Sequence, residues 1–280
     1  KETAPKLGNG ALYTLVGDAP ACDLLSFPIR ITSLTLTPQG QTNKVTVYSG
    51  AIVRLNFASL RDFCTILNVA SVPEGTYEAA NITFSLPQLV VFDPTQSPPS
   101  RVILAEFTTL TPTVPIQPPL TLVKDQVNVL RLDFDLARSV ELDAEGQVTG
   151  GVTPILKATP IVATESEGFG ELNNLIGFVR SVSPYSAVQD FTGSFSLQLL
   201  AGSGPNVTVN LTEATHLFGT PALNQLETGR YAEVEAFVDA KGNIVAKSVE
   251  VEERAFVELD KVAFLGYVTS VTKDTDGNVT

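Results

Sequence analysis

Oxygen-bearing side chains near the end of the sequence have the spacing of a calcium-binding loop. Asp274, Asp276 and Asn278 stand at alternate positions, with Gly277 between the last two. Ca²⁺ binds through such oxygen ligands, and a bidentate glutamate further along completes the set in an EF-hand. No glutamate follows here, and the same residue types form a stable turn. The sequence therefore favours a turn over a calcium site, and calcium is the one cofactor that it leaves open.

Groups for catalysis are scarce. His216 is the single histidine, and a Ser-His-Asp triad needs a nucleophile on a strained elbow, for which no G-x-S-x-G motif is present. Residues 190–194 resemble the Asp-Thr-Gly-Ser loop of aspartic proteases, but Phe191 interrupts the loop and no partner motif supplies a second carboxylate. Phosphate loops, zinc signatures and dinucleotide fingerprints are missing from the sequence. We predict a protein that is not an enzyme, with His216 in a short helix or loop and 190–194 in a hairpin turn.

The two cysteines, Cys22 and Cys64, could form part of a metal site, a disulfide or two buried thiols. A zinc site needs further ligands at close spacing, and the chain has one histidine to offer. A disulfide across this long loop would stabilise the fold by about 3–4 kcal/mol, and disulfides persist in oxidising compartments. We therefore predict a Cys22–Cys64 disulfide and an extracellular or cell-surface location, with two buried thiols as the alternative.

Carboxylates gather at two further places. Asp133 and Asp135 share a strand face with Arg131, and Asp18 and Asp23 flank the first cysteine region. Together they could hold a hard cation. The alternative is a solvated sheet face with an ion pair, which contributes under about 1 kcal/mol. The sequence favours the ion pair.

Four Asn-x-Thr triplets have the acceptor pattern for N-glycosylation; they begin at Asn81, Asn206, Asn210 and Asn278. Threonine-rich strands generate such triplets by chance. The triplets alone therefore do not predict glycosylation.

Composition places these residues on strands. The chain has 280 residues, a length that predicts about two domains, and it is rich in strand-forming and turn-forming residue types. With 18 basic and 30 acidic residues its net charge is −12, which disfavours nucleic acid and anionic membrane surfaces as partners. No apolar run approaches the roughly 20 residues that cross a bilayer. The sequence therefore predicts an all-β protein.

Periodicity predicts where the strands and turns lie. The expected strands cover 11–16, 29–36, 44–48, 52–57, 77–84 and 130–135, with a β-bulge near Ser33 where the apolar alternation slips. Leu60, Phe63, Cys64 and Leu67 have the spacing of a short amphipathic helix. Three segments with Asp first and Gly fourth predict hairpin turns: 143–146, 239–242 and 274–277.

A repeat divides the chain. Residues 176–182 (IGFVRSV) recur as 265–271 (LGYVTSV), which indicates a module used at least twice. A small, acidic, glycine-containing stretch at 163–170 marks a boundary before the first copy. The predicted domains are a flexible lead-in at 1–9, a β-sandwich at 10–160, a small β-barrel-like module at 172–256 and an incomplete second copy of it at 261–280.

The first unit resembles a family of secreted bacterial lipoproteins, domain of unknown function four-three-eight-two, through residues 10–20, 72–77 and 132–140. The second unit resembles the β-barrel-like domain of unknown function five-six-six-six through 177–179, 229–235 and 242–246. The resemblances imply export, often as a lipoprotein, and an Ig-like or transthyretin-like sandwich followed by barrels. They supply no catalytic residues, and any membrane contact would come from a lipid anchor upstream of this sequence.

We therefore predict a non-enzymatic exported surface protein with a structural role. The incomplete repeat predicts self-association into oligomers or filaments by β-strand complementation, because an orphan strand can pair with another chain. The residues expected to form this assembly strand are Val262, Phe264, Leu265, Tyr267, Val268 and Val271. The alternative is an extracellular module that binds a glycan or calcium.

Overall fold

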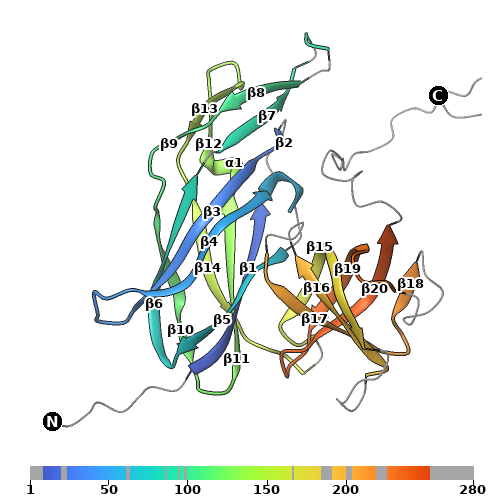
Figure 1. Ribbon diagram of the computed structural model, residues 1–280. Helices are drawn as coiled ribbons and strands as arrows, with labels where there is room; N and C mark the ends of the chain where they lie inside the picture. The colour runs from blue at the N-terminus through green and yellow to red at the C-terminus, as the bar shows by residue number, and fades with distance from the viewer. Residues whose placement is uncertain are drawn as a thin grey trace, which may run out of the picture.

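The computed structural model of the protein describes residues 9–19, 24–60, 64–85, 87–93, 95–97, 100–165, 167–183, 191–199, 204–218 and 226–252. Strands form nearly all of its regular structure, arranged as an elongated domain of β1–β14 beside a smaller domain of β15–β20 (Figure 1). The helical turns in the described part are η1 (Phe57–Ser59) and α1 (Leu136–Ser139). The prediction of an all-β fold is confirmed.

One eight-stranded sheet forms most of the first domain. Its strands in spatial order are β4 (Val45–Asn56), β3 (Pro28–Pro38), β6 (Gly75–Ser85), β10 (Thr113–Leu122), β14 (Leu156–Ile161), β11 (Val127–Asp135), β1 (Asn9–Ala19) and β5 (Cys64–Pro73). Most pairs are antiparallel, whereas β1–β11 and β10–β14 are parallel. The sheet curls so that its outermost strands meet, and the Asn68 side-chain amide donates a hydrogen bond to the Val47 carbonyl at 2.7 Å.

Aromatic side chains fill the core inside this curled sheet. Phe134 lies at the centre, with ring-centroid distances of 5.7 Å to Phe27, 5.3 Å to Phe57 and 5.7 Å to Phe84. Leucine, isoleucine and valine side chains from the alternating inward positions of the strands surround these rings. The alternation expected for 130–135 is present, because Leu130, Leu132 and Phe134 point inward from β11 and the polar residues between them do not.

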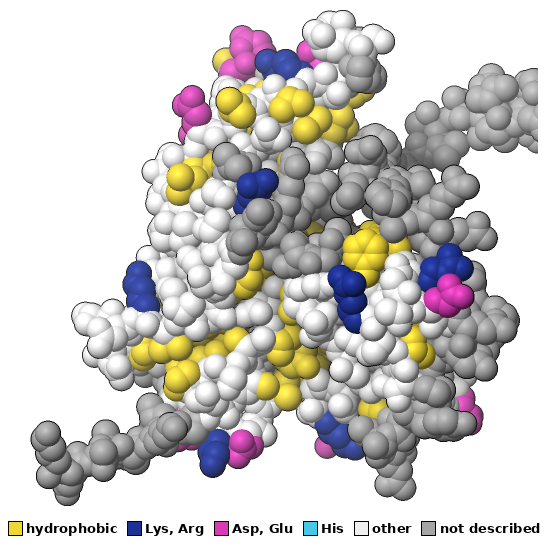
Figure 2. Space-filling model, in the orientation of Figure 1, with side chains coloured by type: hydrophobic (Ala, Val, Ile, Leu, Met, Phe, Trp, Pro, Cys, Tyr) yellow, Lys and Arg dark blue, Asp and Glu magenta, His cyan; other side chains and the backbone are white. Residues whose placement is uncertain are grey.

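Two small sheets cap one end of the first domain, at the top of Figure 1. One is formed by β2 (Leu24–Ser26), β7 (Gln88–Phe92) and β8 (Ser100–Leu104), and the other by β12 (Val140–Leu142), β13 (Val148–Val152) and β9 (Glu106–Phe107). Hydrophobic side chains are visible on the outer surface of this end in Figure 2. We call it the distal end.

The second domain is a closed barrel. Its strands are β15 (Gly170–Ser183), β16 (Gly193–Leu199), β17 (Asn206–Leu211), β18 (His216–Phe218), β19 (Tyr231–Val238) and β20 (Ile244–Glu252). The order β17-β16-β15-β19-β20 is closed by parallel pairing of β17 with β20, and β18 pairs with the rest of β20. If the five barrel strands are numbered one to five along the chain, the order is 1-2-3-5-4-1. This is the Greek-key connectivity of an OB-fold.

Local predictions from the sequence are mostly confirmed. The register of β3 shifts between Ile31 and Ser33 against both neighbouring strands, which is the predicted bulge. The turns at 143–146 and 239–242 close hairpins with Gly146 and Gly242 at φ of 79° and 84°. His216 lies in strand β18 rather than in a helix or loop. The third turn, at 274–277, lies outside the described residues.

The predicted helix around Cys64 is wrong. Cys64 and Leu67 lie in strand β5, whose first four residues are all buried. The physical reason is that this strand is covered on both faces, with Leu67 in the core of the first domain and Cys64 and Ile66 against the barrel. A strand buried on both faces has no alternation of apolar and polar residues, so its pattern can imitate a helix.

Candidate functional site

A second hydrophobic core, that of the barrel, is shared between the two domains where they meet. The outer face of the first sheet contributes Leu15, Cys64, Ile66 and Val129. The barrel contributes its inward-pointing residues to the same cluster; they are Leu172, Leu175, Val179, Phe195, Leu197, Leu199, Val207, Val209, Leu211, Leu226, Ala232, Val234, Ala236, Val238, Ile244, Ala246 and Val249. The barrel therefore docks on the first domain through side chains that are continuous with its own interior.

Polar contacts fix the barrel in place. The Tyr13 hydroxyl donates a hydrogen bond to the Gly242 carbonyl at 3.1 Å, and the Cys64 thiol donates to the Glu171 carbonyl at 3.1 Å. A methyl group on Gly242 would overlap the side chain of Val127 from the first domain. The turn between β19 and β20 is thus held against the first domain by a close approach that only glycine permits.

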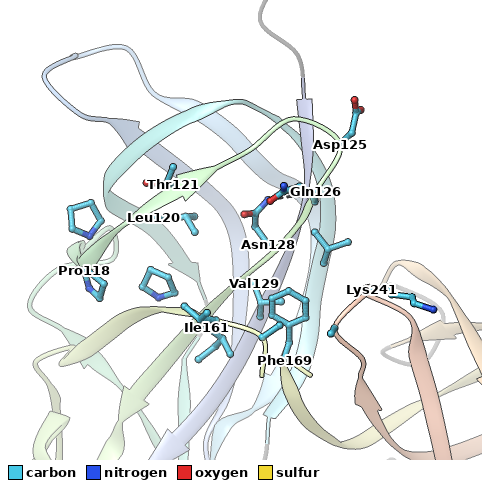
Figure 3. A pocket seen from close by; sticks show the side chains of 16 residues that line it. Pro118, Leu120, Thr121, Asp125, Gln126, Asn128, Val129, Ile161, Phe169 and Lys241 are labelled. Atoms are coloured by element: carbon cyan, nitrogen blue, oxygen red, sulfur yellow. Dashed lines mark hydrogen bonds between the residues drawn. The ribbon is translucent and has the colours of Figure 1, made fainter. Parts of the chain in front are cut away.

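A cleft of about 640 Å³ opens beside this contact (Figure 3). One wall is the hairpin of β10 and β11, another is the end of β14 with the connection to the barrel, and the third is the turn between β19 and β20. The lining residues are Pro118, Pro119, Leu120, Thr121, Asp125, Gln126, Val127, Asn128, Val129, Pro160, Ile161, Val162, Ala163, Phe169, Ala240 and Lys241. The volume lies within the range of about 300–1,000 Å³ that is common for small-molecule sites.

Apolar and polar groups are separated in the cleft. In Figure 3, Val129, Ile161 and Phe169 lie together, and Pro118 lies on the far side of Ile161 from Phe169. The amides of Gln126 and Asn128 lie toward the other end, and Lys241 projects from the barrel turn beyond Phe169. The Asn128 side chain donates to the Gln126 backbone carbonyl at 3.2 Å, which orients its amide.

Charged residues in the described part form no cluster that could hold a metal ion. No group of three His, Cys, Asp or Glu side chains close enough to hold a metal ion occurs in it. Asp133 pairs with Arg131 at 2.7 Å, whereas Asp135 accepts a hydrogen bond from the Arg138 backbone N–H at the start of α1. The two carboxylates therefore have separate partners, and the ion pair favoured by the sequence is present.

The remaining residues that could take part in chemistry lie at the surface, lead into a strand or fall outside the described residues. His216 is exposed and lies 6.5 Å from the Phe218 ring. Thr192 donates its backbone N–H to the Leu211 carbonyl and leads into β16. The side chains of Asp18 and Asp23 lie outside the described part. So do Asp274, Asp276 and Asn278, and the calcium hypothesis stays a prediction.

The predicted disulfide is not present in the structure. Cys64 is a free thiol, and Cys22 lies outside the described residues. The reason lies in the tertiary structure, because Cys64 faces the barrel and its sulfur contacts the Glu171 carbonyl. Burial raises the pKa of this thiol, with a partly opposing effect of Arg131. Cys64 therefore belongs to the domain contact.

Two of the Asn-x-Thr triplets are engaged in the fold. The Asn81 side chain accepts from Lys44 at 2.9 Å and from Thr113 at 2.8 Å, and it donates to Thr37 at 3.1 Å. Asn210 is buried and donates to the Ile244 carbonyl at 3.1 Å. The folded chain thus uses both amides internally.

The structure explains the repeated sequence. The first copy lies in β15, which pairs with β16 on one side and β19 on the other. A methyl group on Gly177 would overlap the Gln198 carbonyl of the paired strand β16, so this position requires glycine. Gly266 has the same place in the second copy. The predicted assembly strand, which includes Val262, Leu265 and Val271, lies outside the described residues. So do residues 1–8 of the predicted lead-in at 1–9, whereas Asn9 begins β1.

Fold and cleft define a two-domain all-β protein with an OB-type barrel at its C-terminal side. Residues 182–250 match the family described as Domain of unknown function (DUF5666). The match covers the end of β15 and the rest of the barrel strands up to β20, in agreement with the resemblance of the second unit. Comparison with curated proteins gave no match, and comparison with solved structures gave none either. No helix in the described part is long and apolar enough to span a membrane.

Reasoning from the sequence missed the cleft. Its walls come from three distant stretches, and no single motif joins them. Two weaker signals were present in the sequence: the proline-rich segment around Pro118 and Pro119, and the turn at 239–242. Neither indicates which surface the turn contacts.

Proposed function

We propose that this protein is a non-enzymatic surface protein with a structural role, in which the two domains act as one rigid unit. The shared hydrophobic core carries this proposal. Flexible tandem domains meet through small, polar interfaces, whereas a large apolar interface opposes relative motion. Here Ile66 and Val129 are buried between a sheet and the interior side of a barrel.

Hydrogen exchange measured by mass spectrometry tests the rigid unit. Amides of β5 and β15 should exchange only through the same global opening, because each strand depends on the other for its cover. Barrel amides that exchange much faster than those of the first sheet would show that the barrel opens alone. That outcome would contradict the proposal.

Export is part of the proposal. Its support is the resemblance of the first unit to the secreted lipoprotein family, together with the acidic, charge-poor composition of the chain. The free thiol of Cys64 removes the argument from a disulfide. Fractionation of the native host with an antibody to the protein tests the location, and a signal confined to the cytoplasm would contradict it.

Self-association through the second repeat copy extends the structural role. In the barrel, β15 pairs with β16 through residues 177–183 and with β19 through residues 170–178, so the centre of the strand has a partner on each side. Strand complementation would therefore require residues 262–271 to occupy the position of β15 in another copy. The matching glycines, Gly177 and Gly266, support this equivalence.

Light scattering and negative-stain microscopy over a wide concentration range test this assembly. Gly266→Val should abolish the oligomers, since the Gly177 position tolerates no side chain. Thr269→Val is the matched control, because Arg180 at the equivalent position is exposed. A monomer at every concentration would contradict self-association.

Ligand binding at the cell surface is the second candidate function. The cleft of about 640 Å³ between the domains favours an organic ligand such as a glycan. The described carboxylates form no group that could hold calcium. The residues predicted to bind it, Asp274, Asp276 and Asn278, lie outside the described residues. A thermal shift on adding calcium, lost in Asp274→Asn and Asp276→Asn, would restore the calcium alternative.

A further inference from the structure

We propose that the cleft between the domains binds a neutral saccharide, with a sugar ring packed against Phe169 and its hydroxyls bonded to Gln126 and Asn128. This inference rests on the second candidate function above and names its ligand class and its site. It assigns the ligand to the junction of the two domains.

The apolar part of the cleft suits the flat face of a sugar ring. The partly exposed side chains of Phe169 and Ile161 line the cleft together with Pro118, whereas Val129 next to them is buried (Figure 3). Phe169 is half-buried, and its backbone N–H donates to the Val238 carbonyl at 2.7 Å. The ring is therefore held by the barrel while part of it remains accessible. Such patches with a few polar groups are typical of small-molecule sites.

The polar part offers neutral donors and acceptors that are not used by the fold. The Gln126 amide and the Thr121 hydroxyl are exposed and have no hydrogen-bond partner among the described residues. The Asn128 amide nitrogen is oriented by the Gln126 carbonyl, so its oxygen is left as an acceptor. Amides and hydroxyls both donate and accept, which matches the mixed requirement of sugar hydroxyl groups.

Charge in the cleft favours an uncharged ligand. Asp125 and Lys241 are the charged residues of its lining, and their charges cancel. Asp125 also lies 3.8 Å from the ammonium group of Lys124. Recognition of a phosphate or a nucleic acid needs clustered Arg or Lys side chains, which the lining does not provide.

Backbone chemistry disfavours a peptide strand in the cleft. Peptides often bind by adding a strand to an exposed sheet edge through backbone hydrogen bonds. Pro118, Pro119 and Pro160 lie in the lining and have no backbone N–H to donate. A saccharide does not need such a ladder, so the same prolines act only as apolar surface.

The cleft is preformed. Its walls belong to two domains that are fixed to each other by the shared core and by the Tyr13–Gly242 hydrogen bond. A preformed site avoids the loss of conformational freedom that weakens binding to mobile loops. The rigid domain contact thus gives the cleft a constant shape.

Isothermal titration calorimetry of the whole protein with neutral tri- to hexasaccharides of glucose, mannose, galactose and N-acetylglucosamine tests the proposal. At least one series should bind, and Gln126→Ala and Asn128→Ala should each raise Kd about three- to tenfold through loss of a hydrogen bond. Asn206→Ala is the matched control, because Asn206 is an exposed amide on β17, away from the cleft lining. It should leave Kd unchanged.

Three results would overturn the proposal: no heat with any neutral saccharide at millimolar concentration, equal loss of affinity in the Asn206→Ala control, or binding of a proline-rich peptide or an inositol phosphate instead. Hydrogen exchange on the same samples separates this failure from failure of the structural role. Shared protection of β5 and β15 without saccharide binding would leave the rigid unit standing and reject the cleft as a sugar site.

Discussion

Two apolar surfaces of the first domain differ in what covers them. At the domain contact, Ile66 and Val129 are at most 1% exposed beneath the barrel. At the distal end, Val102 and Leu104 are 62% and 73% exposed. All four residues are aliphatic side chains on β-strands. The comparison teaches that the barrel docks at one particular face. Hydrophobicity alone does not choose that face.

Shape and glycine placement distinguish the covered surface. The covered face meets the turn between β19 and β20, where Gly242 permits close approach. It also meets strand β15, where the Glu171 carbonyl accepts a hydrogen bond from Cys64. The distal end has a short edge strand, β8, with two exposed apolar side chains. Exposed single apolar residues are normal on soluble proteins, whereas buried ones contribute stability in proportion to the area removed from water.

The largest difference is expected from truncating one side chain on each surface. Ile66→Ala should lower the free energy of unfolding by about 2–5 kcal/mol, because it leaves a cavity between the domains. Leu104→Ala should change it by less than about 0.5 kcal/mol, because that side chain is already in water. Urea unfolding followed by circular dichroism measures both. Similar losses in the two variants would show that the distal end is also covered.

A pair of matching turns gives a sharper test. Gly146 and Gly242 follow the same Asp-x-x-Gly pattern, and in both turns the aspartate carboxylate accepts backbone N–H groups. Gly146→Ala should destabilise by about 1 kcal/mol through its positive φ alone, since open space surrounds it. Gly242→Ala should destabilise by about 1–3 kcal/mol more, because the added methyl overlaps Val127. Equal losses of unfolding free energy in the two variants would mean that the domains shift to accommodate the added methyl group without a measurable cost.

Removing one hydrogen bond across the domains has a smaller expected effect. Tyr13→Phe deletes the donor to the Gly242 carbonyl and should destabilise by about 0.5–1.5 kcal/mol. Tyr77→Phe, which deletes the 2.8 Å hydrogen bond to the Pro73 carbonyl within the first domain, is a control for removal of a tyrosine hydroxyl in general. The readout is faster hydrogen exchange at 239–243 in Tyr13→Phe. Unchanged exchange there would show that the bond does not hold the turn.

The smallest effect appears only at alkaline pH. Burial raises the pKa of the Cys64 thiol above its ordinary value of 9.0, so the folded state retains the proton longer than the unfolded state does. The associated stability is fully present below pH 9 and is lost as the pH rises through the folded pKa. Cys64→Ala should therefore flatten the fall in urea midpoint above pH 9. A fall that persists unchanged would assign it to other groups, such as Tyr13, whose pKa burial also raises.

Local features of this protein could be predicted from its sequence. The bulge at Ser33 and the two glycine turns follow from side-chain alternation and from the need for positive φ, which depend on neighbouring residues alone. The strand at 130–135 follows from its period of two. The barrel-like second unit was indicated by short patterns that agree with the family match at 182–250.

Other features were decided by the tertiary structure. The segment at Cys64 has a helical spacing of apolar residues but forms a strand whose second face is covered by the barrel. The sequence pattern does not show which distant residues will cover that face. The same docking leaves Cys64 a free thiol facing Glu171. The cleft forms only where Asn128, Phe169 and Lys241 meet. The sequence by itself thus determined the all-β class and its turns through local conformational preference, whereas burial between distant strands decided the domain contact and the candidate site.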